Sequence, residues 1–519
     1  MAARAIQKVR VFLLFTFFFV LWTTFPALAQ APGSLDARID AILSPLADTV
    51  SSAIFYAIPV GEAQVRLIVV WLIVVAVSFT LYLRFINLWG FRHAVDIMLG
   101  KYSDASQPGE VSHFRALSAA LSGTVGLGNI AGVAVAIAVG GPGATLWMIV
   151  AGFFGMASKF AECTLGVKYR VLHADGTVSG GPMYYLSRGL AEIGLPRLGR
   201  GLAVCFAMAC VGGAIGAGNM FQANQAYQQF VIVTGGEASL FHDQGWLFGL
   251  ILAVVVGLVI IGGIKSIAQV TARIVPFMGI TYLLAGFVIV ATHAERIPAA
   301  ILTIVEGAFT PAAGFGGLIG VLMMGFQRAT FSNEAGIGSA PIAYASIRTS
   351  EPVSAGFLSL LEPFIDTIII CTMTAFVIVL SGVYLEKEIY LDGNALGGVL
   401  MTSAAFAQTI DWFPYVLALV VTLFAVSTII TWSYYGLKCW TYLFGETRRV
   451  DQAFKVLFLA FTVMGSAMSL RSIIDFSDAM IFAMAFPNAI GLYLLSGKLR
   501  ADLQSYWKRV KAGEIAPRK

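Results

Sequence analysis

Long apolar segments recur along this chain and set the strongest limit on its fold. Of its 519 residues, 58% are hydrophobic and only 12% are charged. A soluble chain of this length needs much more polar surface, whereas about 20 consecutive apolar residues can cross a bilayer as a helix. We therefore expect an all-α, polytopic membrane protein with eleven transmembrane helices. The predicted spans are 65–88, 114–140, 143–168, 199–224, 245–264, 268–292, 315–347, 353–381, 414–440, 453–472 and 476–496.

The first 29 residues have the pattern of a cleavable signal peptide. Arg4, Lys8 and Arg10 precede a short apolar run, and Ala-Leu-Ala at 27–29 forms a small-x-small cleavage site. An uncleaved first membrane helix is the alternative, although the run is short for a span. We expect cleavage after Ala29, which places the mature N-terminus outside the cytoplasm.

Lys and Arg residues collect in every second predicted loop and give the orientation. The predicted cytoplasmic loops are basic, whereas the opposite loop 225–245 has no Lys or Arg and the loop 382–413 has only Lys387. This is the positive-inside distribution of membrane proteins. The net charge of +5 thus belongs to membrane loops and does not indicate a nucleic-acid partner. We expect a multi-pass protein of the bacterial inner membrane with a cytoplasmic C-terminus.

Motifs for catalysis, metal binding and nucleotide binding are absent from the sequence. It has no GxxxxGK[ST] loop and no HExxH, and its five cysteines show no metal-ligand spacing. Gly126 and Gly128 are followed by Gly132, one position late for a dinucleotide fingerprint, and no strand precedes them. We expect neither an enzyme nor a bound cofactor.

Two of the predicted spans contain stretches that weaken a helix. The first is SGTVGLGN at 122–129, and the second is GFQRATFSNEAGIGSAP at 325–341. Gly costs a helix about 1 kcal/mol and Pro about 3 kcal/mol. Unwound backbone survives in a membrane only beside a polar cavity. The two stretches head two groups of five predicted helices and run in opposite directions, which favours an inverted repeat with a site near the bilayer midplane.

The same motifs resemble those of a known family. GTVGLGNIAGVA, SNEAGIGSAPIAYA and GGPMYYL are similar to the alanine or glycine:cation symporter family, from about residue 60 onward. The resemblance implies a leucine-transporter-type 5+5 inverted repeat with broken core helices 1 and 6 and one extra N-terminal helix. It also implies symport of alanine or glycine into the cell, driven by sodium or sometimes by protons. The signal-like N-terminus departs from the commoner family pattern.

This organisation divides the chain into five parts, and we expect it to act as a monomer. A signal peptide (1–29) precedes a periplasmic segment, the extra helix and a cytoplasmic linker (30–110). Core repeat 1 (111–293), core repeat 2 (294–497) and a basic tail (498–519) follow.

The candidate substrate-binding residues lie mainly at the two breaks. Backbone N–H groups of Gly126 and Gly128 can receive a carboxylate at the end of a half-helix, and the freed carbonyl of Thr124 can face the ammonium or an ion. Close helix packing is the alternative for the glycines. Asn219 and Gln222 are further candidates, which line the substrate path or form hydrogen bonds between helices. Phe326 and Gln327 lie at the second break. Trp432 is the last candidate, which forms a wall of the substrate pocket or is an ordinary packed or interfacial residue.

The candidate sodium ligands follow from the resemblance to the fold. They are the side-chain oxygen of Asn129, the carbonyl of Val125, and the hydroxyls of Ser427 and Thr428 on core helix 8. A proton is the alternative coupling ion.

Candidates for gating or coupling are the polar residues of the second break. They are Arg328, Asn333 and Glu334, and a structural pair between Glu334 and Arg328 is the alternative to a role in transport. Glu362 and Asp366 share a helix face as a proton relay or as ordinary cavity-facing acids. An ion channel is the alternative from a different class, but no filter motif or charged ring supports it.

Overall fold

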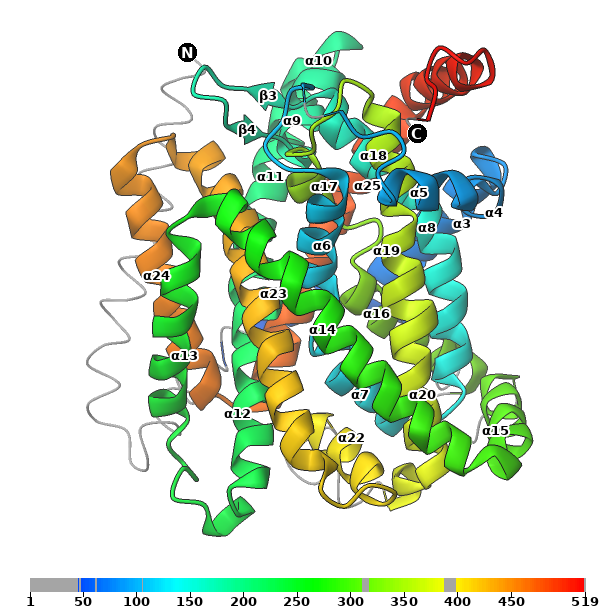
Figure 1. Ribbon diagram of the computed structural model, residues 1–519, viewed down its shortest axis with the longest axis vertical. Coiled ribbons are helices and arrows are strands. Elements are labelled where there is room, and N and C mark those ends of the chain that lie inside the picture. Colours follow the sequence, from blue (N-terminus) through cyan, green and yellow to red (C-terminus); the bar gives the residue numbers. More distant parts are fainter. Residues whose placement is uncertain are drawn as a thin grey trace.

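The computed structural model describes residues 45, 48–60, 63–104, 106–309, 317–386 and 398–517. The predicted signal peptide and Lys387 lie outside these residues. Within them the fold is almost entirely helical, and two short antiparallel hairpins are its only sheets: β1 (Ala57–Val60) with β2 (Ala63–Arg66), and β3 (Val171–Leu172) with β4 (Val178–Ser179). Figure 1 shows long helices running side by side, with the hairpin β3–β4 at one end of the bundle.

The first half of the chain begins with a single apolar helix and continues into a broken one. After α3 and the short helices α4 and α5, α6 ends at a break and the chain resumes as η1 and α7, at an angle of 50° to α6. The bounds are α3 (Leu67–Tyr82), α4 (Ile86–Trp89), α5 (Phe91–Met98), α6 (His113–Thr124), η1 (Gly128–Gly132), α7 (Val133–Gly140), α8 (Ala144–Lys168), α9 (Pro182–Tyr184), η2 (Tyr185–Gly189), α10 (Leu190–Glu192), α11 (Pro196–Ile215), η3 (Gly216–Met220), α12 (Phe221–Val233), η4 (Gly236–Ala238), α13 (Gly245–Ile260) and α14 (Gly263–Thr292).

The second half contains the other break, between α16 and α17. Pro341 near the start of α17 and the two glycines of the break, Gly336 and Gly338, explain why one continuous helix does not form here. The bounds are η5 (Ala294–Arg296), α15 (Ile297–Phe309), α16 (Gly317–Asn333), α17 (Ala340–Tyr344), α18 (Pro352–Ser359), α19 (Leu361–Pro363), η7 (Phe364–Cys371), α20 (Thr372–Ser381), η8 (Val383–Glu386), α22 (Gly398–Ala407), α23 (Phe413–Phe444), α24 (Arg448–Ala467) and α25 (Leu470–Lys511).

The described helices include seven that are long and apolar enough to cross a membrane, or eight if the bent pair of α6 with η1 and α7 is one span. Each of the eleven predicted ranges holds at least one helix, but α3, α13 and α16 are shorter than that test requires. The range predicted as a basic tail, 498–519, begins within α25, which continues without interruption to Lys511. The protein is therefore a multi-pass helical membrane protein.

Both breaks lie in the centre of the bundle. Every residue from 116 to 138 and from 325 to 347 is buried by surrounding protein. The outer helices show the opposite pattern, since α14 exposes Phe277, Leu284 and Phe287 on its surface. Irregular backbone is thus enclosed by protein while apolar side chains face outward, as the bilayer requires.

Candidate functional site

At the first break, side-chain oxygens accept hydrogen bonds from backbone N–H groups that have lost their helical partners. The residues between α6 and η1 lose helical hydrogen bonds, and Asn129 Oδ1 accepts from the Gly126 N–H at 2.9 Å. Gln222 Oε1 on α12 accepts from the Leu127 N–H at 3.0 Å. The Gly128 N–H donates no hydrogen bond to any described residue. Of the two predicted glycines, Gly128 therefore keeps the free backbone donor.

The second break places an acidic residue in an unusual conformation. Glu334 has a φ of 57°, in the left-handed region, and Gly336 and Gly338 follow at 83° and 91°. Asn333 Oδ1 accepts from the Ala335 N–H at 2.9 Å, and Asn488 on α25 donates to the Gly336 carbonyl at 2.9 Å. A non-glycine residue in this region is strained by about 1–3 kcal/mol, a cost that is concentrated at functional sites.

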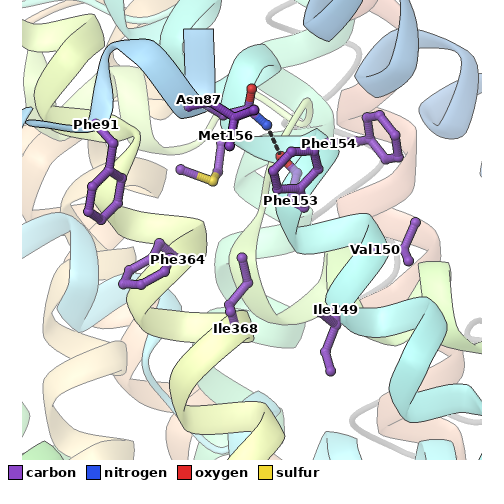
Figure 2. Close-up of a pocket in the computed structure, with 10 residues that line it drawn as sticks. Asn87, Phe91, Ile149, Val150, Phe153, Phe154, Met156, Phe364 and Ile368 are labelled. Carbon is purple, nitrogen blue, oxygen red and sulfur yellow. Dashed lines mark hydrogen bonds between the residues drawn. The ribbon is translucent and has the colours of Figure 1, made fainter. Parts of the chain in front are cut away.

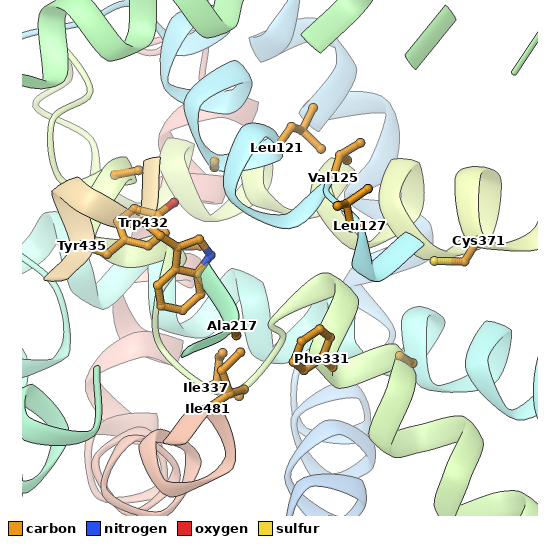
Figure 3. Close-up of a cluster of buried hydrophobic side chains, with 14 of the residues drawn as sticks. Leu121, Val125, Leu127, Ala217, Phe331, Ile337, Cys371, Trp432, Tyr435 and Ile481 are labelled. Carbon is orange, nitrogen blue, oxygen red and sulfur yellow. The ribbon is translucent and has the colours of Figure 1, made fainter. Parts of the chain in front are cut away.

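A small enclosed cavity lies between the two breaks. Its free volume is about 10 Å³, which is the space for about one water molecule. Figure 3 shows Trp432 and Phe331 on opposite sides of this region, with Ala217 and Ile481 below the indole. The lining residues are Gly123, Thr124, Gly128, Ala217, Gln222, Phe331, Glu334, Trp432 and Ile481.

Trp432 on α23 joins the two breaks through one side chain. Its Nε1 donates to Glu334 Oε1 at 3.0 Å and to the Gly123 carbonyl at 3.2 Å. Glu334 also accepts from Ser339, so both of its carboxylate oxygens are bound. Gly218 packs so closely against the indole that a Cβ there would lie 2.2 Å from Trp432 Cγ. Trp432 is thus a fixed wall of the cavity, with its polar edge turned to the acid of the second break.

Asp366 connects the first break to α16. Its carboxylate accepts from Asn129 Nδ2 at 2.6 Å, from Ser332 Oγ at 2.9 Å and from Thr367 Oγ1 at 2.8 Å. Asn333 donates to Thr367 at 2.9 Å and extends the network to the second break. Asn129 therefore forms hydrogen bonds both to the backbone of the first break and to Asp366 on η7.

Two of the four predicted sodium ligands, Ser427 and Thr428, lie on α23 where it contacts α6. Thr428 Oγ1 donates to the Ser122 carbonyl at 2.9 Å, and Ser427 Oγ donates to the Phe424 carbonyl at 3.0 Å. The Val125 carbonyl accepts no hydrogen bond from a described residue. No group of three or more His, Cys, Asp or Glu side chains among the described residues can hold a metal. An ion at this place would therefore depend on carbonyl, hydroxyl and amide oxygens.

Four charged side chains without solvent contact lie beside the cavity. Lys159 Nζ on α8 is 3.1 Å from Glu362 Oε1 and 3.9 Å from Glu162 Oε1, and all three side chains are fully buried. Glu334 lies near enough to interact electrostatically with Lys159. Asn488 donates to Glu162 Oε2 at 3.0 Å. Three carboxylates thus share one ammonium in a low-dielectric interior, where unpaired charge is costly.

Arg328 pairs with a different acid from the one that the sequence suggested. It forms an ion pair with Asp478 on α25, and no described contact joins it to Glu334. Gln327 Nε2 donates to the same Asp478 carboxylate at 2.7 Å, and Arg66 at the start of α3 donates to Gln327. The alternative of a structural Arg328–Glu334 pair is therefore wrong. Because Arg328 lies 5.0 Å from the centre of the Phe331 ring, this network also reaches the wall of the cavity.

The structure brings together five of the eight predicted substrate residues and sets three apart. Thr124, Gly128, Gln222 and Trp432 line the cavity, and Gly126 packs against Thr428 and Gln222. Asn219 instead donates to the Phe458 carbonyl at 2.6 Å, Gln327 belongs to the Arg328 network, and Phe326 is buried but does not line the cavity.

Several residues of the site were not singled out from the sequence. Ala217, Phe331 and Ile481 are apolar positions in apolar helices, so nothing in the sequence distinguishes them. Lys159, Glu162 and Asp478 did carry a signal, because a charge inside a predicted span usually faces the interior of the bundle.

The fold and site define a multi-pass helical membrane protein with a polar cavity between two broken helices. Residues 53–519 match the model of the sodium:alanine symporter family, and the chain belongs to this family. It is 40% identical over 428 residues to the sodium/alanine symporter AgcS of Methanococcus maripaludis, covering 82% of this chain and 91% of that protein.

Other relatives carry different descriptions. The chain is 32% identical to the probable sodium/glutamine symporter GlnT of Bacillus subtilis, over 86% of this chain and 89% of that protein. It is 33% identical to the putative sodium/proton-dependent alanine carrier protein YrbD of the same organism, over 84% and 88%. The solved structure of MhsT in complex with L-phenylalanine has the same leucine-transporter fold, with a TM-score of 0.51 and 15% identity over 75% of this chain and 99% of that one.

Proposed function

We propose that this protein carries a small neutral amino acid, alanine or glycine, into the cell together with sodium by alternating access. The enclosed cavity between the two breaks carries this proposal, because it joins a free backbone N–H, a carboxylate and an indole in about 10 Å³ of free space. Alanine is larger than this space, so the walls of the cavity must move apart to admit it, and a substrate with a small side chain requires the least movement. The family and the relative AgcS support the same substrate class.

The proposed binding mode follows the polarity of the cavity. The substrate carboxylate is bound by the Gly128 N–H, at the start of η1, where a half-helix presents its positive end. The substrate ammonium faces Glu334 Oε1 and the carbonyls of the first break, including that of Thr124. Gln222 and Trp432 close the two sides. Gly126 holds the turn open rather than binding the substrate, because its N–H is already bound by Asn129.

Sodium, in this proposal, occupies the contact between α6 and α23. Hard cations prefer oxygen ligands, and the unpaired Val125 carbonyl, Thr428 and Ser427 can supply them. Asn129 belongs to the same network, and its bonds to Gly126 and Asp366 tie ion occupancy to the shape of the substrate site. A hydroxyl that donates one hydrogen bond still has lone pairs for an ion.

We propose an architecture of eleven spans, with α3 as the extra helix and two inverted groups of five. The paired breaks at α6 and α16 support the repeat, as does the leucine-transporter fold of MhsT. The loop charges support a cytoplasmic C-terminus in a bacterial inner membrane. Arg328, paired with Asp478, is the proposed gate on the side of the cavity where α3 begins.

Proton coupling is a second candidate, favoured by the buried group of Lys159, Glu162, Glu362 and Glu334. Three carboxylates that share one ammonium can exchange a proton when the neighbouring helices move. YrbD is described as sodium/proton-dependent, which supports keeping this candidate. Proton coupling predicts uptake that follows an imposed pH gradient without sodium.

Accumulation of radiolabelled alanine in proteoliposomes tests the proposed function. We expect uptake above equilibrium only with an inward sodium gradient, and Gly128→Leu to abolish alanine binding while the protein remains folded. Full alanine binding by Gly128→Leu would remove the proposed carboxylate site. Accumulation with a proton gradient alone would favour the second candidate, and a rapid downhill ion leak would favour a channel.

A further inference from the structure

A basic hollow lies beside the end of α3, where the last part of α25 passes close to it. The hollow has a volume of about 420 Å³. Four cationic side chains line it: Arg84 after α3, and Arg500, Lys508 and Lys511 on α25. Figure 1 shows this end of α25 at the same end of the bundle as α4. Among the residues that the structure describes, no carboxylate lines the hollow.

The charges of the hollow differ from other basic residues of the same region in having no acidic partner. On or beside α25, Lys168 pairs with Asp502 at 2.5 Å and Arg509 pairs with Glu351 at 2.5 Å. Lys498 also pairs with Glu192. The four cations of the hollow form no ion pair with a described residue. Like charges held together repel one another, so a bound anion would stabilise this arrangement.

Aromatic rings line the same hollow and indicate its level relative to the membrane. Tyr82, Trp89 and Trp507 line it, and Arg500 lies 5.1 Å from the centre of the Tyr82 ring. The rings of Trp89 and Trp507 are 5.0 Å apart. Trp and Tyr concentrate at the level of lipid headgroups. The hollow therefore lies at the edge of the membrane, where α3 leaves the apolar layer.

Exposed apolar side chains continue from the hollow. Leu81 is 57% exposed and Leu88 is 62% exposed. Leu88 also lines a second, apolar hollow of about 570 Å³ with Phe91, Phe153 and Phe364 (Figure 2). The consecutive residues Leu88 and Trp89 thus line an apolar hollow and a basic one, respectively. A ligand with an anionic head and an apolar tail matches both.

We propose that the basic hollow binds the phosphate group of an anionic phospholipid, whose acyl chain lies against the apolar side chains around Leu88. Arg84, Arg500, Lys508 and Lys511 supply the positive charge, and the rings of Trp89 and Trp507 enclose the headgroup. Basic pockets at the cytoplasmic ends of membrane helices bind anionic headgroups in this way. The site shares no lining residue with the substrate cavity and does not depend on which amino acid or ion is transported.

Binding of radiolabelled phosphatidylglycerol to the purified full-length protein in neutral detergent tests the proposal, with phosphatidylcholine as the neutral lipid. We expect a clear preference for phosphatidylglycerol. Removing two charges in Lys508→Gln with Lys511→Gln should weaken its binding by about 30-fold, since each basic residue contributes roughly 1 kcal/mol. Both side chains are exposed, so the variant should melt at the same temperature as the wild type.

The matched control is Arg448→Gln with Arg449→Gln, which removes two exposed charges from the start of α24. This control should bind phosphatidylglycerol as the wild type does, and so should the charge-conserving pair Lys508→Arg with Lys511→Arg. Equal binding of both lipids, or an equal loss in the two Gln pairs, would overturn the proposal. Displacement of the lipid by inorganic phosphate at a similar concentration would overturn the lipid part and leave a simple phosphate site.

Discussion

Trp432 Nε1 lies 3.0 Å from Glu334 Oε1 and 3.2 Å from the Gly123 carbonyl, so one indole bonds both to the second break and to the helix that leads into the first. The two breaks are far apart in the sequence, and this pair of bonds fixes the distance between them. A substrate that enters the cavity meets this indole and this carboxylate together. The pair therefore couples substrate binding to the relative position of α6 and α16.

Replacing the indole should weaken binding without unfolding the protein. In Trp432→Phe, Glu334 loses a donor and the cavity loses part of its wall. A hydrogen bond to a charged group contributes about 1.5–3 kcal/mol, so we expect alanine affinity to fall by at least tenfold. Trp440→Phe is the control, because Trp440 Nε1 on the same helix donates no hydrogen bond to a described residue. Calorimetric or scintillation binding measures both, and an equal loss in both variants would contradict a specific role.

A methyl group at Gly126 should disrupt the first break. The added Cβ would lie 2.5 Å from Thr428 Oγ1 and 3.1 Å from Gln222 Oε1. We expect Gly126→Ala to lose most sodium-dependent alanine uptake. The control is Gly132→Ala, where a Cβ meets no atom within 4 Å. Uptake by Gly126→Ala equal to that of Gly132→Ala would show that the close approach of α6, α12 and α23 does not matter for transport.

Loss of the proposed ion ligands should change the sodium dependence. We expect Asn129→Ala and Thr428→Ala to raise the sodium concentration for half-maximal uptake by tenfold or more, because each removes the side-chain oxygen of a proposed ion ligand, from η1 and from α23 respectively. Thr422→Ala is the control, since Thr422 on the same helix only bonds the Ala418 carbonyl. Sodium titrations of initial uptake rates measure the effect. Unchanged sodium dependence in both variants would refute the assignment.

Neutralising Asp478 should destabilise the protein. In Asp478→Asn the buried Arg328 loses its counter-ion, and breaking such a pair costs about 3–5 kcal/mol. We expect the melting temperature in detergent to fall by several degrees. Asp451→Asn should have little effect, because its pair with Lys455 is partly exposed. A melting temperature of Asp478→Asn that matches the wild type would mean that Arg328 finds another partner or water.

Acid should destabilise the region around α5 through His93. This side chain is 7% exposed and lies 2.9 Å from the Tyr506 hydroxyl. Burial lowers the pKa of His93 to about 4, against a smaller opposing effect of Asp96. Because the folded pKa is below the unfolded value of about 6.5, the neutral side chain contributes stability that is complete above pH 6.5. This contribution, at most about 3 kcal/mol, is lost as the pH falls from 6.5 to 4.

The melting temperature of the wild type and of His93→Gln, measured between pH 7.5 and 4.5, checks this expectation. The wild type should lose stability more steeply below pH 6.5 than the variant. Parallel curves would show that other groups cause the acid sensitivity.

The sequence predicted the positions of the helices and of both breaks because these depend on local properties. Long apolar runs mark spans, and glycines with a proline mark the loss of a helix. Gly128 and Trp432, which the sequence marks as candidate substrate-binding residues, both line one cavity. These residues lie in stretches whose composition is unusual for a membrane helix.

The sequence did not predict which side chains pair across the bundle. Whether Arg328 meets Glu334 or Asp478 depends on how α25 packs against α16, and residue spacing within one helix does not contain that information. The group around Lys159 and Glu362 also requires α8 and α19 to be adjacent. Asn219 is another such case. It lies three residues before Gln222, but its amide donates to the Phe458 carbonyl on α24 and does not line the cavity.

Equilibrium binding of alanine to the purified protein, measured against sodium concentration at fixed pH, tests the central claim most directly. The coupling of Asn129 to both the first break and Asp366 predicts that alanine binds tightly only with sodium, and that Asn129→Ala requires much more sodium for the same affinity. Alanine affinity that is equal with and without sodium in the wild type would contradict a sodium-coupled site between the two broken helices.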